Sequence, residues 1–128
     1  MAAGTTAQTS NTIWPVQNQK IEGEVWEVVF VHTFASGQAD ATTITIPING
    51  ILRHITTVTS GASGAVVTAT TTINDNANQA IFSDAAIAES TTSNYSVDEP
   101  LSGDIDFIVT PSTDPLSAYT VTWTIRGI

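Results

Sequence analysis

The stretch Ala41–Ser60 constrains the fold of this chain more than any other part of the sequence. Isoleucine occupies every second position from Ile44 to Ile48, which places these side chains on one face of a strand. Asn49-Gly50 follows, and both residues tolerate the positive φ angles of a type I′ turn. The pattern predicts a β-hairpin in which Ile51–Thr59 returns antiparallel to the first strand. Pro47 cannot donate a ladder hydrogen bond, so we expect a sheet edge or a bulge there.

The same alternation predicts further strands along the chain. The clearest runs are Gly23–Phe34, Ala65–Ile73, Asp104–Thr110 and Tyr119–Arg126, and Gln79–Ser83 can form a shorter strand. We expect the last strand of the chain, Tyr119–Arg126, to lie inside a sheet. Only Asp84–Ser90 has a helical composition, and Thr91–Gly103 is expected to be a long polar connection. Roughly seven or eight strands with short turns and almost no helix indicate an all-β protein, an antiparallel β-sandwich or jelly-roll-like domain.

The N-terminal segment is small and polar, so we predict an extended arm at residues 1–16 and a single β-sandwich domain at residues 17–128. The apolar group Ile13, Trp14, Pro15 and Val16 is interpreted as an edge strand or a docking anchor. In the alternative, Trp14 folds back onto its own core. Tyr95 falls in a stretch without regular alternation and is therefore free to meet a partner. These five residues are the candidate interface.

Charge limits the classes of partner. The chain of 128 residues carries 12 Asp and Glu but 3 Lys and Arg, a formal net charge of −9. Binding to nucleic acid requires basic side chains that replace the counterions of the phosphates, so nucleic acid is not an expected partner. An anionic membrane surface is disfavoured for the same reason. The charged fraction of 12%, against about 25% in ordinary domains, implies a surface of Thr, Ser, Asn and Gln. Such a surface is common on extracellular and virion β proteins.

No constellation for catalysis or metal binding stands out, so no enzyme activity, cofactor or metal site is predicted. The chain has no cysteine, and neither His32 nor His54 has an acidic or histidine partner nearby in sequence. The acidic groups Asp75, Asp98-Glu99 and Asp104–Asp106 offer the oxygen ligands that Ca²⁺ prefers, but without the spacing of an EF-hand. We expect solvated turns there, and Ca²⁺ binding at one of the acidic groups stays an open alternative.

Four segments resemble small structural proteins of tailed bacteriophages. They are INGILRHITTVTSG (Ile48–Gly61), INDN (Ile73–Asn76), VDEPLSG (Val97–Gly103) and the terminal YTVTWTIRGI (Tyr119–Ile128). The resemblance covers most of residues 24–128 as a pattern of strands and turns, and it brings no catalytic residue with it. Several proteins of this kind are capsid decoration, or cement, proteins.

The resemblance implies a virion structural protein on the outer capsid surface, where it binds the major capsid protein and stabilises the shell. It also implies a homo-oligomer, expected as a trimer at three-fold or quasi-three-fold points, and the polar arm could add a strand to a neighbour. The alternative is a β-sandwich module that binds carbohydrate or a receptor, on a phage fibre or a cell surface. That alternative predicts exposed aromatic side chains at Trp14 or Tyr95.

Overall fold

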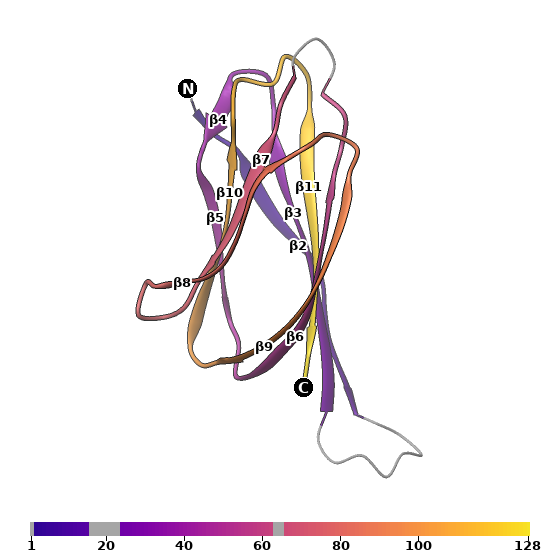
Figure 1. Cartoon of the computed structure of the whole chain (residues 1–128), viewed down its shortest axis with the longest axis vertical. Coiled ribbons are helices and arrows are strands. Elements are labelled where there is room, and N and C mark those ends of the chain that lie inside the picture. The colour runs from indigo at the N-terminus through magenta and orange to yellow at the C-terminus, as the bar shows by residue number, and fades with distance from the viewer. Residues whose placement is uncertain (1, 16–23, 63–65) are drawn as a thin grey trace.

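The computed structural model describes residues 2–15, 24–62 and 66–128, and in them the chain is an all-β sandwich (Figure 1). The strands, in chain order, are β1 (Ala2–Ala3), β2 (Thr5–Pro15), β3 (Glu24–Phe34), β4 (Gln38–Asp40), β5 (Thr42–Pro47), β6 (Gly50–Thr59), β7 (Ala69–Asn74), β8 (Ala80–Ile87), β9 (Thr92–Leu101), β10 (Asp104–Pro111) and β11 (Tyr119–Gly127). The expected fold class is confirmed, although the described residues form more strands than the sequence predicted.

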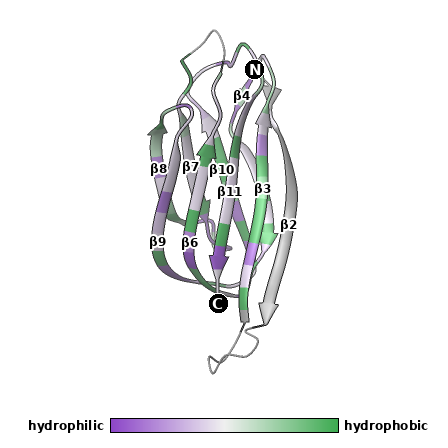
Figure 2. Cartoon of the chain, turned by 90° about the vertical axis from the view of Figure 1, so that its right-hand side faces the viewer, coloured by the Kyte–Doolittle hydropathy of each residue, from purple (hydrophilic) through white to green (hydrophobic). Residues whose placement is uncertain are grey.

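Two antiparallel sheets face each other. The wide sheet has the order β2-β3-β11-β6-β9, and Figure 2 shows these five strands side by side. The narrow sheet has the order β5-β10-β7-β8, and the short β1 and β4 pair in parallel beside them. From β5 onward most connections cross from one sheet to the other, while β7 and β8 form a hairpin. The crossings fix the two sheets to each other along the chain.

The core between the sheets is centred on three aromatic rings. Phe30 on β3 stacks on Trp123 of β11 with ring centroids 5.6 Å apart. Phe107 reaches them from β10 of the narrow sheet, with centroids 4.9 Å from Phe30 and 5.6 Å from Trp123. All three side chains are completely buried. Aromatic contacts of this kind add about 0.5–1.5 kcal/mol each to the gain from burial, so this cluster holds the two sheets in register.

The strands with the clearest alternation form as predicted. In β3 the residues Trp26, Val28, Phe30, His32 and Phe34 are buried, and in β11 the buried residues Tyr119, Val121, Trp123 and Ile125 alternate with partly exposed threonines. β11 lies between β3 and β6, which confirms the expected interior position of the last strand. The isoleucines of β5 point inward, and β5 is an edge of the narrow sheet, as Pro47 indicated.

The predicted hairpin at Asn49-Gly50 is wrong. β5 pairs with β10 in the narrow sheet, whereas β6 pairs with β11 and β9 in the wide sheet, so the chain crosses the sandwich at this point. The Asn49 side-chain oxygen accepts the backbone N–H of Gly103 at 3.3 Å, and Ile48 donates its N–H to the Gly103 carbonyl at 3.0 Å. The crossing therefore packs against the turn between β9 and β10. It lets both strands direct their apolar faces into one core.

Two other local predictions are wrong. Asp84–Ser90 is not helical, because β8 continues through Asp84 to Ile87 and pairs with β7. Thr91–Gly103 is not a connection, because it contains β9, the outer neighbour of β6. Both strands lie at sheet edges, where the inward face is incompletely buried. Their sequences therefore lack the alternation that marks the inner strands.

The segment predicted as an arm lies largely within the wide sheet. Thr5–Pro15 forms β2, which pairs antiparallel with β3 and has a register shift between Gln8 and Ser10. Upstream of it, Gly4 donates its backbone N–H to Thr42 Oγ1 at 2.9 Å. A Cβ at Gly4 would meet the Thr33 carbonyl oxygen at 2.5 Å, so only glycine allows this approach. In the single chain, β2 is thus a strand of the sandwich rather than a projecting arm.

Candidate interaction surface

Three of the five candidate interface residues lie at the end of β2. Ile13, Trp14 and Pro15 occupy register positions opposite Trp26, Val25 and Glu24 of β3, and Val16 lies outside the described residues. The expectation of an edge strand at Ile13–Pro15 is therefore met, since β2 is an outer strand of the wide sheet. Their role as a docking anchor stays a prediction.

Tyr95 lies on the opposite edge of the same sheet. It is on β9, opposite Ile55 of β6, and is partly buried. Its ring packs edge-on against Phe82 of β8, with centroids 5.0 Å apart. Four interstrand spacings of about 4.8 Å separate β2 from β9, roughly 19 Å. The structure does not bring Tyr95 together with the residues of β2, and Tyr95 helps to close the side of the sandwich.

The outer face of the wide sheet carries an uncharged patch. We call it the valine–threonine face and define it by Val29, Val31, Thr56, Val58, Thr122 and Thr124. Cross-strand pairing places them together: Thr122 stands between Val31 and Val58, and Thr124 between Val29 and Thr56. Val58 is the most open of these three valines, with 41% of its surface exposed. The alternation along each strand marks its outward residues, but it does not show that those of β3, β11 and β6 form one face.

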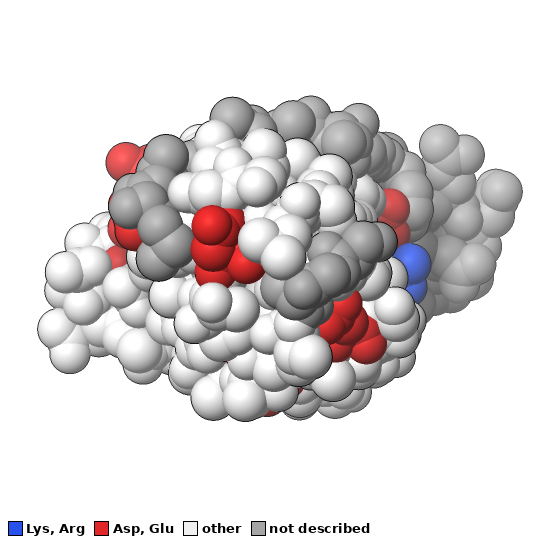
Figure 3. Space-filling view, turned by 90° about the horizontal axis from the view of Figure 1, so that it is seen from above, with Lys and Arg blue, Asp and Glu red and all other residues white. Residues whose placement is uncertain are grey.

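Charged side chains border this face rather than interrupt it. At its lower end Arg126 donates from Nε to Glu27 Oε2 at 2.7 Å, and Arg53 lies 3.6 Å from the Asp98 carboxylate. Both arginines, the cationic side chains that the structure describes, are therefore in ion pairs. In Figure 3, which shows the upper end of the molecule, most of the described surface is neutral and the acidic groups form separate patches. This distribution offers no basic track for a phosphate backbone.

A shallow polar groove is the second candidate feature. It has a volume of about 670 Å³ and is lined by Thr45, Asp75, Asn76, Asn78, Gly103, Asp104 and Asp106. Thr45 donates its hydroxyl to Asp106 Oδ1 at 2.6 Å, and Asp75 Oδ1 accepts the backbone N–H groups of Ala77 and Gln79. Two of the acidic groups noted in the sequence thus meet here, which sequence spacing could not show.

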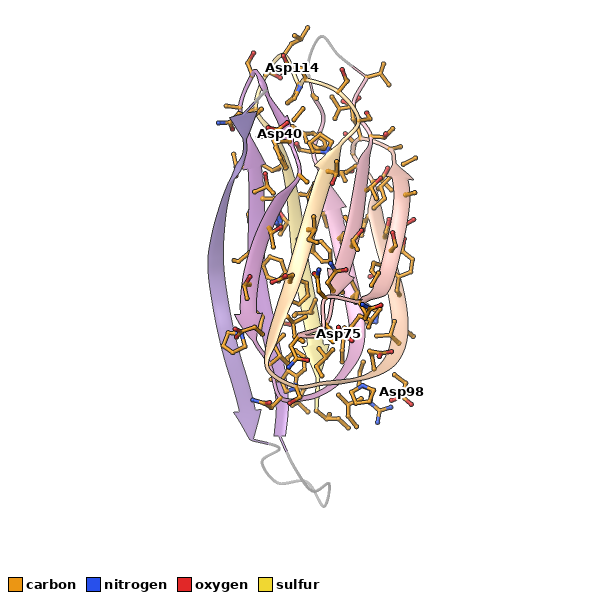
Figure 4. All side chains as sticks on the ribbon, turned by 90° about the vertical axis from the view of Figure 1, so that its left-hand side faces the viewer. Asp40, Asp75, Asp98 and Asp114 are labelled. Atoms are coloured by element: carbon orange, nitrogen blue, oxygen red, sulfur yellow. The ribbon has the colours of Figure 1, made fainter. Side chains whose placement is uncertain are left out.

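The groove does not gather a metal-ligand set. Among the described residues there is no group of three or more His, Cys, Asp or Glu side chains placed to hold a metal ion. Asp98 lies on β9, pairs with Arg53 and is not part of the groove lining. Figure 4 shows Asp40 and Asp114 at the upper end of the molecule, with Asp75 and Asp98 in its lower half. Of the acidic side chains that the sequence offered for Ca²⁺, Asp75, Asp104 and Asp106 line the groove, whereas Asp98 lies apart from them.

The two histidines lie in different environments. His32 is completely buried, and burial lowers its pKa to about 4 although nearby carbonyl groups of Phe107 and Thr42 favour the protonated ring. His54 lies partly exposed on β6, with Nε2 3.4 Å from the Asn94 side-chain oxygen. His32 is a packed core residue, and neither histidine is paired with a nucleophile or a carboxylate.

Comparisons with known proteins identify no family. No protein-family model matches the chain, and no curated protein matches it significantly. No helix in the described part of the chain is long and apolar enough to cross a membrane.

Several solved structures are similar to the chain at low identity. The chain is similar to dimeric latent PorU from Porphyromonas gingivalis, with 11% identity, a TM-score of 0.46 and 87% of this chain covered, but it spans only 14% of that protein. It is also similar to the carbohydrate-binding module CBM36 in complex with calcium and xylotriose, with 12% identity, a TM-score of 0.41 and coverage of 94% of this chain and 97% of the module. A protein of infectious bursal disease virus strain Gx gives 11% identity and a TM-score of 0.41, over 93% of this chain and 37% of that one. With TM-scores below 0.5 and identities of 11–12%, these similarities assign neither a family nor a function to the chain.

Proposed function

We propose that the chain is a non-enzymatic structural protein of a virion, a decoration protein that binds the major capsid protein on the outer surface of the shell. The observation that carries the proposal is the valine–threonine face. A small ligand needs a concave pocket that surrounds it, whereas this face is the outer side of a sheet and contributes no residue to the polar groove. Exposed apolar side chains in a surface without charged residues are a feature of contacts with another protein.

The net charge of the protein also supports a position on the outer surface of a virion. With a formal net charge of −9, the protein is repelled by DNA packaged inside a shell. A protein on the outer surface of the shell is separated from this DNA. The resemblance of Ile48–Gly61 and Tyr119–Ile128 to phage structural proteins falls on the strands that build this face, β6 and β11. Many copies on one shell add weak contacts together, so each single contact can be modest.

The interior of the sandwich suits a stiffening role. Phe30, Trp123 and Phe107 hold the two sheets together, and most of the described core residues have almost no exposed surface. A core packed at the density of a crystal resists deformation. A protein of this kind that bridges neighbouring capsid subunits would oppose their separation under internal pressure.

The direct test is cosedimentation with capsid shells of the virus that encodes the chain. The variant Val58→Lys places a charge at the most exposed valine of the valine–threonine face, and we expect roughly tenfold weaker shell binding or more. Val66→Lys is the matched control, because Val66 is 84% exposed in the loop before β7 and lies outside this face. Absence of binding by the unmodified protein would overturn the proposal. Equal binding by Val58→Lys and the unmodified protein would overturn the choice of face.

Deletion of residues 1–16 is a less direct test than a point substitution. It removes β2 and uncovers the edge of β3, so weaker shell binding could follow from a damaged sheet. Point substitutions on the outer face avoid this difficulty, because they leave every strand in place.

Glycan binding is the second candidate, and the polar groove is the observation that favours it. Asn76, Asn78 and Thr45 offer amide and hydroxyl groups at a groove of about 670 Å³, the kind of lining that hydrogen-bonds sugar hydroxyls. Tyr95 is not part of that lining and packs against Phe82. A glycan array decides the point: glycan retention that Asp106→Asn abolishes, without loss of stability, would favour this function over the first.

A further inference from the structure

Four strands form the edges of the two larger sheets that the structure describes: β2 and β9 in the wide sheet, and β5 and β8 in the narrow sheet. An edge strand presents unpaired backbone N–H and C=O groups that can pair with another chain. Natural proteins block such edges with charged residues, proline or bulges. The four edges of this protein differ in how far they are blocked.

Three of the edges carry clear blocking features. β9 contains Asp98 and Pro100 near one end. β8 contains Asp84, and Ala86 has a positive φ of 58° that bends the strand. β5 has six residues and ends at Pro47. Extended pairing with another strand is unfavourable at each of these edges.

β2 is different. Its eleven residues, Thr5–Pro15, include no charged residue, and the single proline stands at the last position. The register shift between Gln8 and Ser10 interrupts the strand once and leaves Ser10–Trp14 as a continuous run before the proline. β2 is therefore the longest of the four edges and the least blocked.

We propose that β2 pairs antiparallel with β2 of a second copy of this chain, which joins two wide sheets into one continuous sheet about a two-fold axis. A second copy fits this edge because its own β2 is equally long, uncharged and unblocked. The formal net charge of −9 on each chain opposes association in general, and this repulsion is least along a segment that carries no charge. Identical antiparallel strands satisfy each other in a closed, isologous contact, the commonest form of homo-oligomer.

The pairing has a consequence for the outer surface. β2 lies beside β3, so the valine–threonine faces of two copies would lie on the same side of one sheet. The pair would present this face twice. The inference concerns the free protein in solution and does not depend on what the face binds.

The test is the mass of the purified full chain by native mass spectrometry and sedimentation velocity. The unmodified protein is expected at twice its chain mass of 13.4 kDa. The double variant Ala7→Lys/Ser10→Lys places charges at the register positions opposite Val31 and Val29, where lysines from the two copies repel each other. We expect its dimer dissociation constant to rise about tenfold or more.

The matched control is Thr92→Lys/Ser96→Lys, which adds the same charge to exposed positions on β9, the opposite edge of the sheet. It should leave the dimer unchanged. A second measurement, on the unmodified protein, covers the case in which the lysine variant does not fold: hydrogen exchange of the β2 amides should slow as the protein concentration rises through the dissociation constant. A monomer, a trimer, a dimer insensitive to the β2 lysines, or exchange of β2 that is independent of concentration would each overturn the pairing.

Discussion

Trp123 donates its indole N–H to Nδ1 of His32 at 3.1 Å, and neither side chain has any exposed surface. The bond joins β11 to β3 within the core, and it assigns the imidazole proton to Nε2. Nε2 is buried without a partner in good hydrogen-bonding geometry. Protonation of Nδ1 would place a second hydrogen against the indole N–H and create a buried charge. The neutral ring is therefore the form that the folded protein requires.

The first prediction concerns pH. Burial lowers the pKa of His32 from 6.5 to about 4, so between these values the unfolded chain binds a proton that the folded protein does not. The stabilising effect of a neutral His32 is complete above pH 6.5 and is lost as the pH falls towards 4. The full change is about 3 kcal/mol, from about 1.4 kcal/mol for each pKa unit. Urea unfolding at several pH values measures it.

The control for this prediction is the unmodified protein measured under the same conditions. His32→Gln should flatten the dependence of unfolding free energy on pH between 4 and 6.5, so the difference between the two curves is the contribution of His32. Parallel curves for the variant and the unmodified protein would contradict the role of His32.

The second prediction concerns the two buried tryptophans of the wide sheet. Trp123→Phe removes the hydrogen bond to His32 and leaves a cavity beside Phe30. We expect the free energy of unfolding to fall by roughly 2–4 kcal/mol. Trp26→Phe is the matched control, because the Trp26 indole N–H is buried without a hydrogen-bond partner. Replacement of Trp26 removes an unsatisfied donor, so the loss of unfolding free energy should be clearly smaller than for Trp123→Phe. Equal losses in denaturant unfolding would show that the hydrogen bond is unimportant.

The third prediction concerns the crossing from β5 to β6. Gly50 has a φ of 154°, and a Cβ there would lie 2.6 Å from the Ile128 carbonyl oxygen. Gly50→Ala should cost roughly 2 kcal/mol or more, from strain and from this contact. Gly61→Ala serves as the control, because the nearest atom to its Cβ would be Ser90 Oγ at 3.5 Å. A melting temperature of Gly50→Ala as high as that of the control would argue against the crossing geometry.

The fourth prediction concerns Glu89, which holds the loop between β6 and β7. One carboxylate oxygen accepts the Ala62 N–H at 2.5 Å and the other accepts the Val67 N–H at 3.1 Å. Glu89→Ala should cost about 1–3 kcal/mol, because two backbone donors lose a charged acceptor, and Glu89→Gln should cost less. Hydrogen exchange at Ala62 and Val67 should become faster in the alanine variant. Unchanged exchange at both amides would disprove the role.

Glu89 also has an electrostatic effect that can be measured separately. Burial, followed by the negative charge of Glu89, raises the pKa of Tyr119 to about 12. Replacement of Glu89 by glutamine should therefore lower the pKa of Tyr119 in an ultraviolet titration, while burial keeps it above 10.

The sequence predicted the inner strands and the edge strand β5, but it failed at the edge strand β9 and at the end of β8. β3, β7, β10 and β11 each bury one face, and this burial imposes the alternation that the sequence displays. β9 buries its inward face only in part, with Tyr95 and Val97 half-buried, so its sequence resembles a polar loop. Asn49-Gly50 marks a change of direction. It does not say whether the following strand pairs with the preceding one or faces it across a core.

The candidate sites, too, were only partly predictable from local sequence patterns. The valine–threonine face follows from residues that alternate with buried ones, but its extent depends on which strands are neighbours, and β11 separates β3 from β6. The polar groove joins Thr45, Asp75–Asn78 and Gly103–Asp106 from three segments distant in sequence. Pairing of β10 with both β5 and β7 brings them together, and no local sequence pattern indicates this pairing.

The position of β11 in the middle of the wide sheet determines the order in which the protein can assemble during synthesis. β3 and β6 both pair with β11 and not with each other, although the ribosome makes them far earlier. Until residues 119–127 leave the exit tunnel, the inner edges of β3 and β6 have no partner and Phe30 lacks the ring it stacks on. During this time the apolar strands of the nascent chain are exposed, which favours aggregation. Its solubility in the cell depends on how quickly the final strand arrives.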